Sequence, residues 1–227
     1  MSCVGASYHQ FCPVAKAMEL LDERWTMLVV RELAAGSDRF NDLRRGLPRM
    51  SPTLLSRRLT QLEHAGLVQR SKERYQLTDA GQELRPIIES IGAWGVRWMG
   101  ALGDRDLDPK LLLWDMHRNV AHEALPPGRT VIEFHFRGAV SGRRQWWLVL
   151  TADDADVCDS DPGFDVAVVV DADLRTMVDI WLGNTSWNPA LRAQQIRVQA
   201  APVLRRTLPQ WFQLSGFADV PRQPLKS

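Results

Sequence analysis

The first part of the chain reads as amphipathic helices in quick succession. Apolar residues recur at helical spacing over residues 13–21 and 25–35, and we expect Gly36 to end the second of these helices, as glycine often does. A further short helix over residues 40–46 carries two apolar positions, and we expect Ser37 to cap its start. The pattern therefore predicts three short helices before position 50.

The clearest helix start in the sequence is Ser51-Pro52. Serine is a preferred N-cap and proline suits the first helical position, so we predict a helix from there to Gly66. Its apolar residues fall on one side at i, i+4 and i+7, namely Leu55, Leu59 and Leu62. The opposite side is polar and carries Thr53, Arg57, Thr60, Gln61 and His64.

After Gly66 the apolar pattern changes from helical spacing to alternation. Residues 67–71 and 74–77 predict two short strands that turn at Lys72-Glu73. Thr78 is then the expected cap of one long helix, bent by an interior Pro86. Its apolar stripe is longer than a small domain can cover and comprises Leu84, Ile87, Ile88, Ile91, Trp94 and Trp98.

The second half of the chain mixes strands with helices. We expect, in order, a helix at 111–124, strands at 131–137, 145–151 and 164–171, a helix capped by Asp171 or Asp173, a short helix from Asn188, a strand at 196–200 and a closing helix at 202–212. Turn residues between the first two strands make them a hairpin. This order predicts an α+β domain, a small antiparallel sheet covered by helices.

Two domains are the natural reading of 227 residues, because domains cluster near ~100 to 150 residues. The polar, glycine-containing stretch after residue 100 marks the boundary. We therefore predict a first domain at 1–100, a linker at 101–110 and a second domain at 111–227.

The composition, 45% hydrophobic and 24% charged, is typical of a globular protein. The longest clean apolar stretch, residues 166–170, is strand length, and the N-terminus has no basic-then-apolar export signal. We expect a cytoplasmic protein without membrane contact. The three cysteines, Cys3, Cys12 and Cys158, include no CxxC pair, so we expect reduced thiols.

The charge is divided unevenly along the chain although the formal net charge is only +1. From Arg39 to Arg74, nine basic residues stand against three acidic ones, a local net charge of +6. From Asp153 to Asp179, nine aspartates stand against Arg175, a local net charge of −8. The basic stretch suits a phosphate-bearing partner, whereas the acidic stretch would repel nucleic acid.

A helix, a tight turn, a second capped helix and a strand pair form the order of a winged helix-turn-helix, whose second helix enters the major groove of double-stranded DNA. The residues expected to meet base edges are Ser51, Thr53, Ser56 and Arg57. Arg57 is the strongest of them, since a guanidinium matches the two acceptors of guanine. The residues expected to contact phosphates are Arg39, Arg44, Arg45, Arg49, Arg70, Lys72 and Arg74. For Arg58, an internal ion pair and a phosphate contact are both open.

Spaced motifs run through residues 9–98: Cys12-Pro13-Val14, Trp25-Thr26, Arg39-Phe40-Asn41-Asp42-Leu43, Ser51-Pro52, Leu55-Ser56, Arg58-Leu59, Leu62-Glu63, Gly66-Leu67-Val68, Leu77-Thr78 and Gly81. With them the chain resembles the HxlR-type winged-helix transcriptional regulators. The resemblance implies a homodimer formed by the first and last helices of the domain, through Val14, Met18, Ile88, Ile91 and Trp94. The wing is shorter than is usual in the family.

The resemblance also directs attention to Cys12. Some members of the family use the equivalent cysteine as a redox switch, and a position just before a helix favours the thiolate. The alternative is a cysteine packed at the dimer interface.

A second set of motifs spans residues 111–213: 131–138, 147–149, 162–170, 173–174, 181–183 and 196–198. Here the chain resembles the sterol-carrier-protein-2-like lipid-binding fold, which implies an apolar tunnel for an acyl chain, sterol or similar small molecule. Expected lining residues are Phe134, Phe136, Trp146, Trp147, Met177 and Trp181. Neighbouring Trp146 and Trp147 point to opposite faces of a strand, so one of them needs cover from a ligand, a partner subunit or another helix.

Catalytic and metal-binding patterns are missing from the sequence. The five histidines form no HExxH, and neither a glycine-rich phosphate loop nor a GxSxG elbow occurs. The aspartates of residues 153–173 lack EF-hand spacing. We therefore expect no enzyme, no metal and no cofactor.

These observations favour a dimeric DNA-binding transcription regulator whose second domain senses an apolar small molecule or stabilises the dimer. The alternative is a lipid- or sterol-type carrier protein whose winged-helix half serves only for dimerisation.

Overall fold

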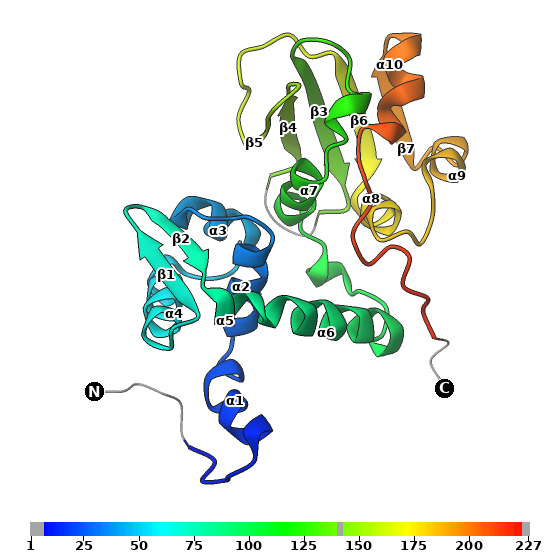
Figure 1. The fold of residues 1–227 in the computed structure, drawn as a ribbon. Coiled ribbons are helices and arrows are strands. Elements are labelled where there is room, and N and C mark those ends of the chain that lie inside the picture. Colours follow the sequence, from blue (N-terminus) through cyan, green and yellow to red (C-terminus); the bar gives the residue numbers. More distant parts are fainter. Residues whose placement is uncertain (1–6, 140–142, 224–227) are drawn as a thin grey trace. The chain divides into compact units, whose positions relative to one another are not determined.

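The computed structural model describes residues 7–139 and 143–223 (Figure 1). The chain divides into two compact units, Met1–Trp94 and Gly95–Ser227. Helix α6 (Leu84–Trp98) runs through this boundary, and the expected linker at 101–110 contains the short 3-10 helix η1 (Asp104–Asp106). No helix in the described ranges is long and apolar enough to cross a membrane.

The first unit opens with four helices at the predicted places: α1 (Pro13–Leu21), α2 (Thr26–Ala34), α3 (Phe40–Gly46) and α4 (Pro52–His64). Ser51 caps α4 as predicted, because its side chain accepts a hydrogen bond from the backbone N–H of Leu54 at 3.3 Å. The cap predicted for Ser37 is wrong. Arg39 occupies the N-cap position of α3, and the buried Ser37 hydroxyl donates to the carboxylate of Glu32 at 3.3 Å instead.

The wing consists of β1 (Val68–Ser71) and β2 (Arg74–Leu77), paired antiparallel with Ser71 opposite Arg74. Lys72 turns the chain between them with a φ of 55°. The predicted hairpin is confirmed. The wing is short because only two residues, Lys72 and Glu73, connect its two strands.

The long helix predicted from Thr78 onward is divided in two. Thr78 caps α5 (Asp79–Gln82), whose helix ends at Glu83 before α6 begins. Pro86 explains the break rather than a bend: it has no N–H to offer the carbonyl of Gln82, and its ring crowds that carbonyl. The core of this unit is formed by the apolar sides of α2 and α4, the wing and the start of α6.

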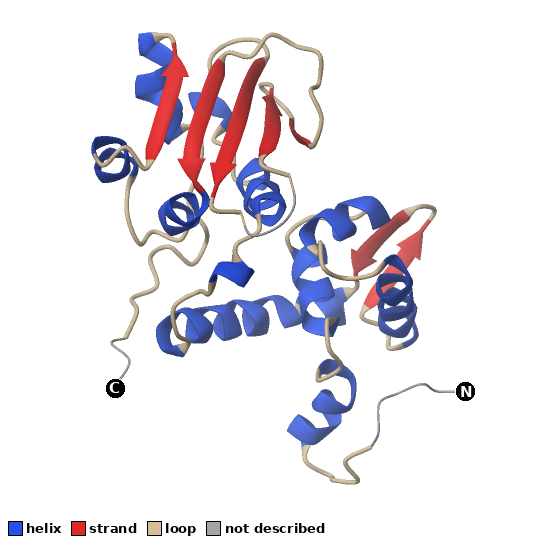
Figure 2. Cartoon of the chain, turned by 180° about the vertical axis from the view of Figure 1, so that it is seen from behind, coloured by secondary structure: helices blue, strands red, loops and turns tan. Residues whose placement is uncertain are grey.

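The second unit has a sheet of five strands: β3 (Thr130–Arg137), β4 (Gln145–Leu150), β5 (Ala155–Cys158), β6 (Val168–Asp173) and β7 (Ile196–Ala200). Their order across the sheet is β5-β4-β3-β6-β7. Its helical segments are α7 (Pro109–Arg118), η2 (His122–Ala124), α8 (Leu174–Trp181), α9 (Trp187–Arg192), α10 (Pro202–Thr207) and η3 (Leu208–Gln210). The helices lie in front of the sheet in Figure 1 and behind it in Figure 2.

The sheet is mixed, so the predicted antiparallel sheet is corrected. Strands β3 and β6 pair parallel, with Phe134 opposite Val170, while the other pairs are antiparallel. Strand β5 was not expected from the aspartate-rich sequence. It runs antiparallel to β4 and so in the direction of β3, and the segment 159–167 returns along the sheet before β6 pairs parallel with β3.

Alternation along the strands separates two faces. Phe134 and Trp146 lie opposite each other on the face that packs against the helices and belong to the apolar core. Trp147 lies opposite Glu133 on the other face, yet only 6% of it is exposed. Of the two neighbouring tryptophans, Trp146 therefore faces the core, and Trp147 is the one for which separate cover is expected.

The face opposite the helices carries a ladder of polar side chains. His135 contacts Glu133 at 2.7 Å and Asp171 at 3.0 Å, and these two carboxylates in turn accept bonds from Gln145 and Gln199. The ladder therefore links β4, β3, β6 and β7. The contact with Glu133, supported by Asp171, raises the pKa of His135 above its usual range.

Candidate nucleic-acid interface

Helix α4 presents one polar stripe to solvent. Thr53, Ser56 and Arg57 are exposed, as is Thr60 one turn further on, and their spacing of i, i+3, i+4 and i+7 places them on one side of the helix. The apolar residues predicted for the other side are buried in the core. A helix with this division can lie with its polar stripe in a groove without losing its packing.

Arg58 belongs to the opposite side from its neighbour Arg57. Its Nε donates to the carbonyl of Arg24 at 3.0 Å, and its two terminal nitrogens donate to the side chains of Gln61 and Glu23. Only 7% of the Arg58 side chain is exposed. The interpretation as an internal ion pair therefore holds, and Arg58 fixes α4 against the turn between α1 and α2.

That turn has an unusual backbone. Trp25, the residue just before α2, has a φ of 79°, in the left-handed region that bulky residues rarely adopt. The guanidinium of Arg24 lies 5.6 Å from the centre of the Trp25 ring. Arg58 therefore stabilises this strained turn, since it donates hydrogen bonds to the carbonyl of Arg24 and to the carboxylate of Glu23.

Basic residues precede α4 in the chain, in and around α3, and follow it on the wing. Arg44 and Arg45 lie in the last turn of α3, and Arg49 lies in the turn before α4. Arg39 precedes α3, and its backbone bridges to that of Arg74 on β2. The exposed side chains of the set are those of Arg39, Arg44, Arg49, Arg70, Lys72 and Arg74, whereas Arg45 is half-buried.

The wing residues have contacts of their own. Arg74 forms an ion pair with Asp38, which offsets part of its charge. The guanidinium of Arg70 lies 5.3 Å from the centre of the Tyr75 ring, and its Nε donates to the carbonyl of Lys72 at 3.3 Å. This stacking orders Arg70 on the surface of the hairpin.

Glu32 is the residue that sequence reasoning missed. This residue of α2 is fully buried against the end of α3, and its carboxylate accepts a hydrogen bond from Arg31 at 2.7 Å. Arg31 also donates to the carbonyl of Gly46 at 3.2 Å. The available signal was an acidic residue inside an otherwise apolar helical stripe, and its effect is to fasten the turn that leads into α4.

Residues 20–102 match the HxlR-like helix-turn-helix family. YvaP, an HTH-type transcriptional regulator of Bacillus subtilis, is 38% identical over 98 residues, which are 40% of this chain and 91% of that protein. The HTH-type transcriptional regulator sll1512 of Synechocystis is 35% identical over 95 residues, 39% of this chain and 70% of that protein. The chain belongs to the HxlR-like helix-turn-helix family.

A solved structure is also similar to part of this HxlR-like protein. The quinone-bound YodB from B. subtilis is 33% identical, covering 37% of this chain and 97% of that chain, with a TM-score of 0.35. The family match ends at residue 102, so it concerns the first unit and not most of the second.

Apolar side chains lie exposed on the first and last helices of this HxlR-like unit. Val14 and Met18 of α1 are exposed, as are Ile91 and Trp94 of α6, at 54% and 56%. Ile87, Ile91 and Trp94 line part of a groove of about 430 Å³ along α6. Ile88, which was expected in the same interface, is half-buried and packs against the core of its own unit.

Cys12 occupies the N-cap position of α1, where its carbonyl accepts from the N–H of Lys16 at 3.0 Å and its thiol makes no cap bond. The thiol is free and half-buried. Its neighbours Phe11 and Val14 are exposed. The position is compatible with both readings of Cys12, so both stay predictions.

The residues expected to line a ligand tunnel lie in the second unit of this HxlR-like protein. They are all buried: Phe134, Phe136, Trp146, Met177 and Trp181 in the core between sheet and helices, and Trp147 on the other face. The rings of Phe134 and Phe136 are stacked 5.6 Å apart. Their role in ligand binding stays a prediction.

Proposed function

We propose that the protein is a transcriptional regulator that binds double-stranded DNA through its first unit. The observation that carries the proposal is the division between Arg57 and Arg58. One guanidinium is exposed on the polar stripe of α4, and its neighbour is locked inside the unit. This division supports a helix that is held rigidly from behind and is free to read a groove in front.

In this proposal α4 lies in the major groove. Arg57 contacts a guanine, and Ser51, Thr53 and Ser56 contact neighbouring base edges. Ser51 keeps its hydroxyl proton for this purpose, since the cap bond uses only its oxygen as acceptor. The exposed arginines of α3, the α3–α4 turn and the wing hold phosphates on either side.

The proposed active form is a homodimer on a two-fold symmetric operator. The exposed apolar faces of α1 and α6 support this, because aromatic and aliphatic side chains that are more than half exposed are stabilised when a second copy covers them. Two recognition helices then reach successive major grooves roughly 34 Å apart.

For the second unit we propose a sterol-carrier-protein-2-like domain that modulates DNA binding. A five-stranded sheet with helices on one face supports the assignment. An apolar effector in this unit would act by changing the spacing of the two recognition helices.

The test is DNA binding by Arg57→Ala, Arg44→Ala and a control variant, Arg205→Ala, which changes an exposed arginine of α10. Arg57→Ala should weaken binding to the preferred sequence and relax its selectivity, Arg44→Ala should weaken all sequences alike, and Arg205→Ala should change neither. A protein that functions normally with both Arg57 and Arg44 replaced is instead the carrier with a winged-helix dimerisation module.

A further inference from the structure

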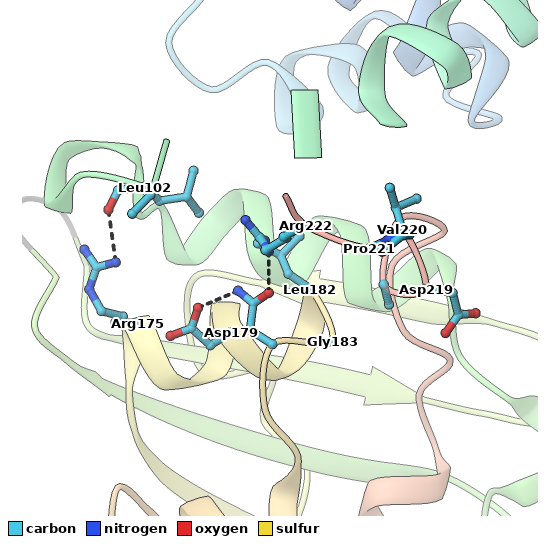
Figure 3. Close-up of a pocket in the computed structure, with 12 residues that line it drawn as sticks. Leu102, Arg175, Asp179, Leu182, Gly183, Asp219, Val220, Pro221 and Arg222 are labelled. Atoms are coloured by element: carbon cyan, nitrogen blue, oxygen red, sulfur yellow. Dashed lines mark hydrogen bonds between the residues drawn. The ribbon is translucent and has the colours of Figure 1, made fainter. Parts of the chain in front are cut away.

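The second unit contains a pocket of about 660 Å³ beside helix α8 (Figure 3). Three segments line it: Ala101 and Leu102 from the chain that follows α6, the exposed side of α8 with the turn after it, and residues 218–222 near the C-terminus. None of the tryptophans or phenylalanines of the apolar core is among its lining residues. The pocket is therefore separate from the tunnel expected from the sequence.

The C-terminal wall of this pocket is held in place by specific contacts. The N–H of Ser215 donates to the carbonyl of Trp181 at 3.0 Å. Gly183, with a φ of 74°, lies so close to the C-terminal segment that a Cβ there would be 2.7 Å from the carbonyl oxygen of Ala218. A residue with a side chain could not occupy this position, so the turn after α8 is adapted to the C-terminal segment.

The polar groups of the pocket form two connected sets. Arg175 donates to the carbonyl of Leu102 at 3.1 Å and to the carboxylate of Asp104 at 2.6 Å. In the other set, the Asn184 side chain donates to Asp179 at 2.9 Å and accepts from the Nε of Arg222 at 2.8 Å. Figure 3 shows Arg222 near the middle of the pocket, between Leu182 and Pro221.

Among the described residues that line the pocket, these bonds leave the guanidinium of Arg222 available to a ligand. Within the described part of the chain, Arg222 uses only its Nε, so both of its terminal nitrogens can donate to a ligand. Arg175 is already committed to Asp104, and Asp219 lies at the far end of the pocket (Figure 3). Leu102, Leu182 and Val220 supply apolar surface beside the free guanidinium nitrogens.

We propose that this pocket binds a small organic anion, a carboxylate with an apolar body. Two parallel N–H groups of a guanidinium match the two oxygens of a carboxylate, which orients the ligand. The apolar body lies against Leu102, Leu182 and Val220, and the volume falls within the ~300 to 1,000 Å³ that small-molecule sites occupy.

The same pocket is placed to regulate the protein, an inference that rests on the proposed function. Leu102 follows α6 by only a few residues, and the N–H of Gln223 donates to the carbonyl of Arg97 in the last turn of α6 at 3.2 Å. A ligand between Leu102 and Arg222 therefore contacts two segments that adjoin the last turn of α6. Since α6 also carries the proposed dimer surface, ligand binding and DNA affinity should be coupled.

The experiment uses the full chain and three probes with one six-carbon body and different heads: hexanoate, hexanamide and hexylamine. Binding is measured by the NMR shifts of the backbone amides of Gly183 and Ala218 and of the side-chain amide of Asn184. Hexanoate should shift these signals saturably and more tightly than hexanamide, and hexylamine should not. Equal binding of all three heads, or shifts confined to other residues, would overturn the proposal.

Variants locate the site. Arg222→Gln should weaken hexanoate about tenfold, as expected for loss of a charge-assisted hydrogen bond. Ala101→Phe should block the pocket with a larger side chain, and Arg205→Gln, an exposed arginine elsewhere in this unit, should have no effect. Unchanged hexanoate binding by both Arg222→Gln and Ala101→Phe would contradict the assignment.

A second arm separates the pocket from the proposed function. Hexanoate should change the DNA affinity of the wild type about fivefold or more, in the range of typical coupling between sites, and leave Arg222→Gln unaffected. DNA binding without hexanoate binding overturns the pocket alone. Hexanoate binding without any DNA binding supports the pocket and overturns the proposed function, and hexanoate binding that leaves DNA affinity unchanged overturns the coupling.

Discussion

The carboxylate of Glu32 occupies the space that a side chain at position 46 would need. A Cβ on Gly46 would overlap both oxygens of Glu32, and Gly46 does not have a positive φ. The requirement for glycine therefore comes from the buried carboxylate beside it and not from the backbone conformation. Because α3 ends at Gly46, this contact fixes the turn that leads into α4.

Gly46→Ala should destabilise the protein by about 2 to 4 kcal/mol, since the added methyl displaces a buried charge from its partners. Urea unfolding measures the change. Gly95→Ala is the matched control: Gly95 lies within α6 and its added methyl meets no described atom within 4 Å, so alanine there should be neutral or stabilising by up to about 1 kcal/mol. Equal effects of the two substitutions would contradict the role of Glu32.

Adjacent arginines on α4 should give opposite phenotypes. Arg58→Met should lower the free energy of unfolding by about 2 to 4 kcal/mol, because Glu23 and the carbonyl of Arg24 lose a buried partner. Arg57→Met should leave stability within about 0.5 kcal/mol, since its side chain is exposed. Chemical unfolding and DNA titration of both variants test this. A stable Arg58→Met protein would show that the internal ion pair does not hold α4.

The exposed stripe of α6 should control the oligomeric state. Trp94→Glu places a charge in the proposed interface, so the mass should fall from twice 25.7 kDa to 25.7 kDa in sedimentation equilibrium. Val203→Glu, at an equally exposed apolar residue of α10, should leave the dimer intact. A wild type that sediments as a monomer at micromolar concentration would contradict the homodimer.

The polar ladder on the sheet should make stability depend on pH. The pKa of His135 is raised, mainly by Glu133 and then by Asp171, so the protonated imidazole stabilises the fold. This contribution is fully present below the unfolded pKa of about 6.5 and is lost as pH rises through the higher folded value. The difference in Tm between wild type and His135→Gln should therefore shrink from pH 5.5 to pH 8.5. A difference that grows over this interval would contradict the assigned ion pairs.

Local signals predicted most of the elements. Serine and proline at positions 51 and 52 set the start of α4, and alternation predicted the wing and the strands that contain Phe134 and Trp147. Strand direction was not predictable, because alternation is the same in parallel and antiparallel pairs. Strand β5 was not predicted because aspartates are unusual in strands, and this short edge strand contains Asp156 and lies among several others.

Only the solvent-exposed part of the candidate site could be predicted from the sequence. The exposed stripe of α4 followed from helical spacing, whereas the supports behind it depend on tertiary contacts. Arg58 meets Glu23 across 35 residues, and Arg31 meets Gly46 across 15 residues. The sequence favours Ser37 as a helix cap and does not show that its hydroxyl donates to Glu32 instead.

The central claim is that this protein reads DNA sequence through α4, and fluorescence anisotropy tests it most directly. Labelled DNA from upstream of the protein's own gene is compared with scrambled DNA of the same length over a salt series. The account predicts tighter binding to the first DNA. For each phosphate contact, the logarithm of the affinity should fall by roughly 0.9 for every tenfold rise in salt concentration, and the preference should be lost in Arg57→Ala. Weak binding that is equal on both DNAs and unchanged by Arg57→Ala would contradict it.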